Sequence, residues 1–291
     1  MDKPRYAVVV VHGIGAGTGA ERKGFSTALL KNVQNHLRGK SGLCWEEAEW
    51  EDVNENVDHV VGRVIRDICA GYLDDVKKRQ ECLSKPWPGE QSKIRILSWL
   101  LRFMRRLIEA VTWLKGAALT EINEYAPDIV DAVVDVPLYL DANHGEKIRE
   151  KVRAAMDAAL SHPDVHGVVL VGHSLGSVIA YDTVLEELGK GNGRRIVALV
   201  TMGSPLGWVS EIRNAEKGVG PSAVQVAVND IPWINFWDAG DPVPERKHLN
   251  ESMFAGVKNE EVKSHADLIK AHCAYWQDDN VAKKVAELCC G

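Results

Sequence analysis

The sequence predicts an α/β fold with a mainly parallel central sheet flanked by helices. Short runs of apolar, β-branched residues alternate with longer segments of helical periodicity, an order that is typical of parallel sheets covered on both faces. Several of the apolar runs end in glycines and polar residues, and parallel sheets place their sites beyond the carboxyl ends of their strands. The chain of 291 residues, 45% of them hydrophobic, is long enough to form one large core.

Five segments are predicted as strands. The first, from Tyr6 to Val11, is continuously apolar and leads into the glycine-rich sequence His12-Gly13-Ile14-Gly15, as expected of a buried strand before a tight loop. The second, from Leu43 to Trp50, carries three glutamates and is expected at an edge of the sheet. The other three are expected at residues 165–171, 196–202 and 233–237.

Four helices are expected around these strands, at about residues 24–37, 144–160, 177–188 and 280–288. In the second of them, Ile148, Val152 and Met156 fall on one face, so that this helix is predicted to be amphipathic. The third is expected to end at the glycine cluster 189–193, because glycine commonly terminates helices.

From about Asn54 to Ala126 the pattern changes to long helical periodicity, interrupted at Pro86 and Pro88. No internal repeat or low-complexity linker accompanies the change. We therefore predict a single domain over residues 1–291, with a helical insertion at about 54–126.

Within the insertion, residues 94–114 have leucines and other apolar residues at helical spacing. Between Lys93 and Lys115 there are six basic residues and one acidic residue, Glu109. Three roles stay open for this amphipathic, basic helix: a cap packed on the core, a lid or acyl pocket over the site, or a peripheral contact with a membrane surface.

Nucleic acid is not an expected partner of this chain. The formal net charge of −6 gives no reason to expect nucleic-acid binding, which depends on clustered basic residues. The apolar run near the N-terminus is too short for a signal peptide or a membrane span, so a cytoplasmic protein is expected. The six cysteines lack the spacing of a zinc site or a disulfide framework and are expected to be free thiols. No metal and no cofactor are implied.

Ser174 is the candidate nucleophile. It lies at the centre of Gly172-His173-Ser174-Leu175-Gly176, directly between a Val-rich strand and a helix. The flanking glycines allow a sharp strand-to-helix turn, which exposes the serine and places it at the positive end of the helix dipole. In such a turn the backbone amide of Leu175 can stabilise an oxyanion.

The second oxyanion donor is expected from the loop after the first strand. Its glycines let the backbone approach a reaction intermediate closely, and the amide of Ile14 is the candidate donor. The alternative is a structural glycine-rich turn that His12 caps.

The acid and the base are expected in the order Ser, Asp, His along the chain. His272, shortly before the last helix, is the favoured base, with His265 as the alternative. Asp241 follows the strand 233–237 on a loop stiffened by prolines and is the favoured acid. Asp238 is the alternative acid.

These residues resemble the α/β-hydrolase superfamily, and specifically its lipase-like members, in both order and spacing. The string from Gly172 to Asp182 is also locally similar to the nucleophile region of intracellular phospholipases A1 of the DDHD type. The resemblance covers about residues 5–50 and 128–290. It implies hydrolysis of a small-molecule or lipid ester through an acyl-enzyme. The alternatives are a phospholipase A1-like, thioesterase or acyltransferase activity, or no catalysis at all, in a binding protein that docks through its basic insertion.

Overall fold

The computed structural model describes residues 5–13, 19–37, 43–50, 53, 139–140, 142–192, 195–216, 231–241, 243–244, 247–264 and 268–290. The chain divides into two compact units, Met1–Trp50 with Glu146–Gly291, and Glu51–Gly145. The fold below is that of the first unit. The predicted insertion at 54–126, its basic helix at 94–114, Ile14 and His265 lie outside the described residues, so what was expected of them stays a prediction.

The core of the first unit is a parallel sheet of six strands in the order β2-β1-β3-β4-β5-β6. Every pair of neighbouring strands is parallel, which confirms the predicted α/β class. The strands are β1 (Arg5–Val11), β2 (Trp45–Ala48), β3 (Val165–His173), β4 (Ile196–Met202), β5 (Trp233–Trp237) and β6 (Val257–Glu261).

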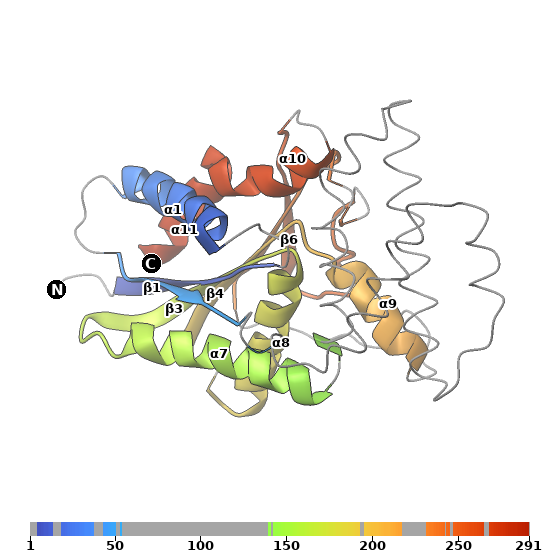
Figure 1. Ribbon diagram of the computed structural model, residues 1–291, viewed down its shortest axis with the longest axis horizontal. Helices are drawn as coiled ribbons and strands as arrows, with labels where there is room; N and C mark the ends of the chain where they lie inside the picture. Colours follow the sequence, from blue (N-terminus) through green and yellow to red (C-terminus); the bar gives the residue numbers. More distant parts are fainter. Residues whose placement is uncertain are drawn as a thin grey trace. The chain divides into compact units, whose positions relative to one another are not determined.

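Helices cover both faces of this sheet (Figure 1). The helices α1 and α11 pack together on one face, and α7 and α8 lie on the other. The described helices are α1 (Gly19–His36), α7 (Ala142–Leu160), α8 (Leu175–Gly189), α9 (Leu206–Glu216), α10 (Leu268–Ala274) and α11 (Asp279–Cys289), with a 3₁₀ turn at Tyr275–Gln277.

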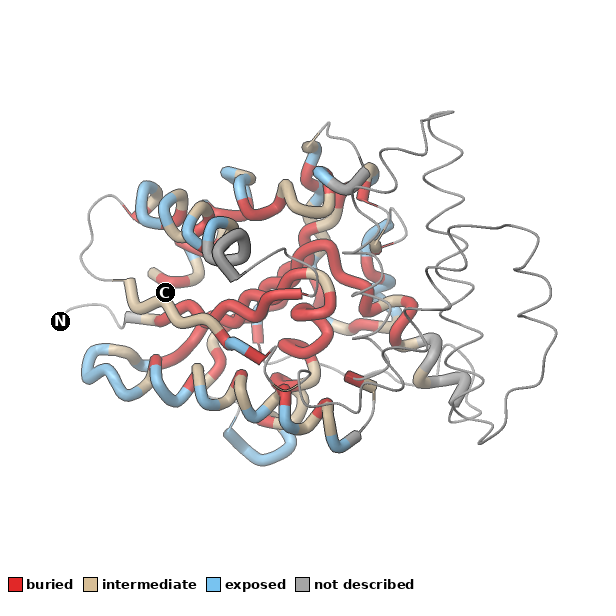
Figure 2. The backbone as a smooth tube through the Cα atoms, viewed as in Figure 1, coloured by how far each residue is buried: buried red, intermediate tan, exposed pale blue. Residues whose placement is uncertain are grey.

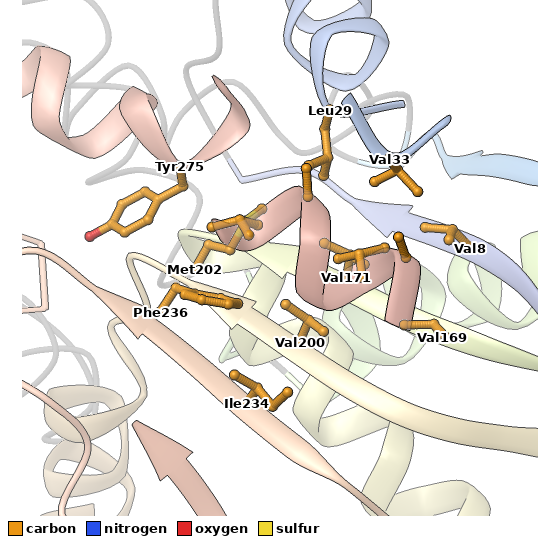
Figure 3. Packing of buried hydrophobic residues seen from close by; sticks show 14 of the residues in the cluster. Val8, Leu29, Val33, Val169, Val171, Val200, Met202, Ile234, Phe236 and Tyr275 are labelled. Atoms are coloured by element: carbon orange, nitrogen blue, oxygen red, sulfur yellow. The ribbon is translucent and has the colours of Figure 1, made fainter. Parts of the chain in front are cut away.

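The register of the strands explains how the core is built. Val8 pairs with Val169, which in turn pairs with Ala198, and Val200 of β4 pairs with Ile234 of β5. Side chains alternate between the two faces of a strand, so these residues form continuous rows on one face. Figure 3 shows the labelled valines of β1, β3 and β4 in one cluster with Leu29 and Val33 of α1. Figure 2 shows the central strands as the most buried part of the backbone.

The five predicted strands are all present, and β2 lies at an edge of the sheet, as its glutamates indicated. The structure adds β6, α9 and α10, which were not predicted. The sequence of β6, Val-Lys-Asn-Glu-Glu, has little apolar periodicity. This segment forms a strand because it pairs with β5, and a pairing between distant segments cannot be recognised from the local sequence pattern.

Two further expectations concern cysteines and membranes. Among the described cysteines, Cys44, Cys289 and Cys290 are free thiols, as predicted, and burial raises the pKa of Cys289 to about 12. Among the helices of the described ranges, none combines the length and the apolar character that crossing a bilayer requires.

Candidate active site

Ser174 occupies a strained turn between β3, which ends at His173, and α8, which begins at Leu175. Its φ of 54° and ψ of −131° make it the one non-glycine residue with positive φ in the described part of the chain. The amide of Ser174 donates a hydrogen bond to the carbonyl of Met202 (3.0 Å), and its own carbonyl accepts one from the amide of Ser177 (2.9 Å). These bonds hold the turn, and Ser174 keeps partial exposure between buried neighbours.

The glycines around Ser174 are required because neighbouring parts of the chain come too close to leave room for a Cβ atom. A Cβ at Gly176 would lie 2.5 Å from the carbonyl oxygen of His12, and one at Gly172 would lie 2.6 Å from that of Gly176. A Cβ at Gly13 would lie 2.5 Å from the Cβ of Ser174. The loop that follows β1 therefore passes directly against the candidate nucleophile.

This contact bears on the two predicted oxyanion donors. Gly13 immediately precedes Ile14, and the position of its missing Cβ is 3.1 Å from the Oγ of Ser174. Leu175 is the first residue of α8, where the backbone amide has no acceptor within the helix. The start of α8 and Gly13 thus both lie next to the serine, and the role of the Leu175 and Ile14 amides as oxyanion donors stays a prediction.

Asp241 and His272 form a hydrogen-bonded pair. The Nδ1 atom of His272 lies 2.9 Å from Oδ2 of Asp241, a carboxylate that is completely buried. The amide of Val243 donates to Oδ1 (2.9 Å) and the hydroxyl of Tyr275 donates to Oδ2 (2.8 Å). These three donors offset the cost of burying the carboxylate. Because Nδ1 donates to Asp241, the Nε2 atom of His272 is the nitrogen that can accept a proton.

The end of β4 connects this pair to Ser174. Gly203 follows Met202, whose carbonyl binds the Ser174 amide. A Cβ at Gly203, which has a φ of 54°, would lie 2.8 Å from Oδ2 of Asp241 and 3.0 Å from Nδ1 of His272. Only glycine suits this position, both by its backbone conformation and by the space available.

The alternative acid, Asp238, has a different set of partners. Its Oδ1 accepts a hydrogen bond from the amide of Gly240 (2.6 Å), and its Oδ2 accepts one from the amide of Ser264 (2.8 Å). Its carbonyl accepts a hydrogen bond from the amide of Asp241 (3.0 Å). Asp238 therefore shapes the turn that carries Asp241, and the structure brings Asp241 to His272.

His272 lies in the last turn of α10, whereas the sequence indicated a loop. His173 contacts it from the nucleophile turn: the Nε2 atom of His173 is 2.7 Å from the carbonyl oxygen of His272, and the two ring centroids are 4.5 Å apart. A carbonyl only accepts, so this nitrogen carries the proton. Burial, and to a smaller degree the charge of His272, hold the pKa of His173 well below its usual value, which keeps the ring neutral.

Tyr275 is a site residue to which the sequence assigned no role. Burial, followed by the negative charge of Asp241, raises the pKa of Tyr275 above its usual value. Its hydroxyl therefore stays protonated and continues to donate to Asp241. Neither Tyr275 nor His173 could be connected with its partner in advance, because 34 and 99 residues separate them along the chain.

Replacing Tyr275 with phenylalanine removes one of the three donors to Asp241. We expect the turnover number for an ester substrate to fall about 3- to 10-fold, and the free energy of unfolding to fall by about 1–2 kcal/mol. Ester kinetics and urea unfolding measure the two effects. Tyr6→Phe is the matched control. Tyr6 lies near the amino end of β1, whereas the candidate site is at the carboxyl end, so this change should leave turnover unchanged. Equal turnover in Tyr275→Phe and Tyr6→Phe would contradict a positioning role for Tyr275.

A separate cluster lies at the amino ends of the strands. Cys44, Glu46 and His162 each have one atom that could bind a metal ion, and these three atoms lie within 4.8 Å of one another. The spacing of these residues in the sequence did not indicate a metal site, because Cys44 and His162 are far apart along the chain and precede different strands. Cys44 directly precedes β2 and His162 precedes β3, so the cluster is at the end of the sheet opposite Ser174 and is not part of the candidate active site.

No protein-family model and no curated protein matches the chain. Among solved structures, the chain is similar to the RedJ thioesterase from the prodiginine biosynthetic pathway of Streptomyces coelicolor. The sequence identity is 17%, the match covers 49% of this chain and 69% of that chain, and the TM-score is 0.33.

Proposed function

We propose that this protein is a serine hydrolase of the α/β-hydrolase fold that cleaves carboxylic esters through an acyl-enzyme intermediate. The observation that carries the proposal is the 2.9 Å hydrogen bond between Asp241 and His272, which lies beside the strained turn of Ser174. A serine hydroxyl is a weak nucleophile and needs an oriented base. The buried pair is suited to supply that base.

The reaction follows from these roles. The Nε2 atom of His272 accepts the proton of the Ser174 hydroxyl while Oγ attacks the ester carbonyl. The amides of Leu175 and Ile14 would stabilise the oxyanion of the tetrahedral intermediate. When the intermediate collapses, the bond to the alcohol oxygen breaks and the alcohol takes the proton from His272. Water, activated by His272, then releases the acid and restores Ser174.

Two features support Ser174 over the neighbouring hydroxyl of Ser177. Ser177 is completely buried, and its hydroxyl hydrogen-bonds with the carbonyl of Ser174 (2.5 Å) and with Oγ of Ser204 (2.7 Å). Ser174 is partly exposed and has the positive φ. A strained and exposed serine at the start of a helix is the geometry that nucleophilic serines require.

The direct assay is release of p-nitrophenol from p-nitrophenyl butyrate by the purified full chain. We expect saturable turnover that prior treatment with a fluorophosphonate abolishes. Butyryl thioesters and phosphatidylcholine, assayed in parallel, distinguish thioesterase and phospholipase activities. If no substrate is turned over above the blank and the fluorophosphonate does not react, the protein is a binding protein and the proposal is wrong.

A further inference from the structure

A cavity of about 500 Å³ has Ser204 and Pro244 in its lining, and these residues lie close along the chain to Gly203 and to Asp241. Its apolar lining comes from Trp208 of α9 and from the segment that follows the Asp241 turn, with Pro244, Leu249, Met253 and Phe254. The volume is within the range of about 300–1,000 Å³ that is usual for small-molecule pockets. The cavity is therefore large enough for part of a substrate.

The cavity is connected with the candidate acid and base through one chain neighbour and one pair of hydrogen bonds. Ser204, which lines the cavity, directly follows Gly203, the glycine packed against Asp241 and His272. The indole nitrogen of Trp208 donates a hydrogen bond to the carbonyl of Val243 (3.0 Å), and the amide of Val243 donates to Asp241. The segment that orients the acid thus also forms a wall of the cavity.

The wall is anchored to the sheet. The amide of Leu249 donates to Oδ1 of Asn259 on β6 (3.1 Å), and the side-chain amide of Asn259 donates to the carbonyl of Leu249 (3.0 Å). The ring of Phe254 packs edge-on against Tyr181 and Trp233, with centroids 5.9 and 5.8 Å apart. These contacts fix Leu249 and Phe254 in the wall of the cavity, as expected of a pre-formed ligand pocket.

The charged residues of the lining, Lys247 and Glu251, are exposed and of opposite sign. They provide no net charge that would select an anion or a cation. Of the buried lining residues, Ser204 is polar and four are apolar, Trp208, Pro244, Leu249 and Phe254. Apolar surfaces favour hydrocarbon by about fourfold in affinity for each buried methylene. The lining therefore matches an uncharged hydrocarbon chain.

We infer that this cavity is the subsite for a hydrocarbon chain of the ester substrate. The inference rests on the proposed function and adds the class of substrate, an ester with an alkyl chain on its acyl or its alcohol side. It predicts that kcat/KM for p-nitrophenyl esters rises at least about 30-fold from acetate to octanoate, or similarly from methyl to octyl acetate. The two series identify which side of the ester carries the chain.

Gly207 provides a precise way to fill the cavity. It is the second residue of α9 and lines the cavity, and a Cβ at this position meets no atom within 4 Å. Gly207→Leu therefore starts its side chain in open space at the wall of the cavity. Gly24→Leu is the matched control, because Gly24 lies in α1, lines no part of this cavity and also has open space around its Cβ. Both changes replace a helical glycine with a better helix former.

We expect Gly207→Leu to lower the ratio of kcat/KM for the octyl ester to that for the short ester at least about tenfold, while Gly24→Leu matches the wild type. An unchanged preference in Gly207→Leu would overturn the inference even if esters are substrates. If the wild type turns over no ester, the proposed function fails separately.

Binding of 8-bromooctan-1-ol tests the cavity without turnover, because bromine quenches tryptophan fluorescence and Trp208 lines the cavity. The wild type and Gly24→Leu should bind it, and Gly207→Leu at least about tenfold more weakly. Equal binding by all three proteins would contradict the inference.

Discussion

Replacing Ser174 with alanine is expected to lower the turnover number for p-nitrophenyl butyrate by at least about 10⁴-fold. The variant loses the oxygen that forms the acyl-enzyme, whereas the oxyanion donors and the binding surface remain. The backbone of the turn should be preserved, because its hydrogen bonds with Met202 and Ser177 involve the amide and the carbonyl of residue 174, not its side chain. Steady-state kinetics, with circular dichroism as a check of folding, measure the change.

Ser177→Ala is the control within the same turn. It removes a hydroxyl that hydrogen-bonds with the carbonyl of Ser174 and with Ser204, so it loosens the turn but retains the nucleophile. We expect a loss of less than about tenfold, in line with one neutral hydrogen bond. A loss in Ser177→Ala as large as that in Ser174→Ala would indicate that the turn, and not the Ser174 hydroxyl, determines activity.

Replacing Asp241 with asparagine is expected to lower the turnover number about 10³- to 10⁴-fold with little change in KM. Both carboxylate oxygens accept hydrogen bonds: Oδ1 from the amide of Val243, and Oδ2 from His272 and Tyr275. The backbone amide of Val243 can only donate, so the asparagine oxygen will face it and its NH₂ group will face His272. The Nδ1 atom of His272 must then accept, and Nε2 carries the proton and can no longer act as a base.

Asp238→Asn is the matched control and also tests the alternative acid. Its carboxylate accepts hydrogen bonds from the amides of Gly240 and Ser264, so the substitution weakens the turn before Asp241. We expect a lower free energy of unfolding, by about 1–3 kcal/mol, and a turnover number within about fivefold of the wild type. A larger loss of turnover in Asp238→Asn than in Asp241→Asn would reverse the assignment of the acid.

The parts of the fold that the sequence predicted are those with strong local patterns. The apolar runs of β1, β3, β4 and β5 are recognisable because strands buried on both faces need apolar side chains on both. The glycines of the nucleophile turn are recognisable because the backbones around Ser174 approach too closely for a Cβ. The candidate acid and base were predicted from the order Ser, Asp, His along the chain, and the structure brings Asp241 and His272 within hydrogen-bonding distance.

The parts that were missed depend on contacts between distant segments. His173 bonds to the backbone of His272, and Tyr275 to the side chain of Asp241, and no spacing in the sequence encodes such pairs. The cavity beside Ser204 has the same origin, because α9 and the segment 244–254 form it together. Such a surface becomes visible only when the elements are packed.

The most direct test of the account is the site of reaction with a fluorophosphonate, located by mass spectrometry of the digested protein. We expect one adduct per chain, on Ser174, with no adduct in Ser174→Ala and a labelling rate at least about 10²-fold lower in Asp241→Asn. Labelling of a different residue, or an unmodified Ser174 in a protein that still hydrolyses esters, would contradict the assignment of Ser174 as the nucleophile.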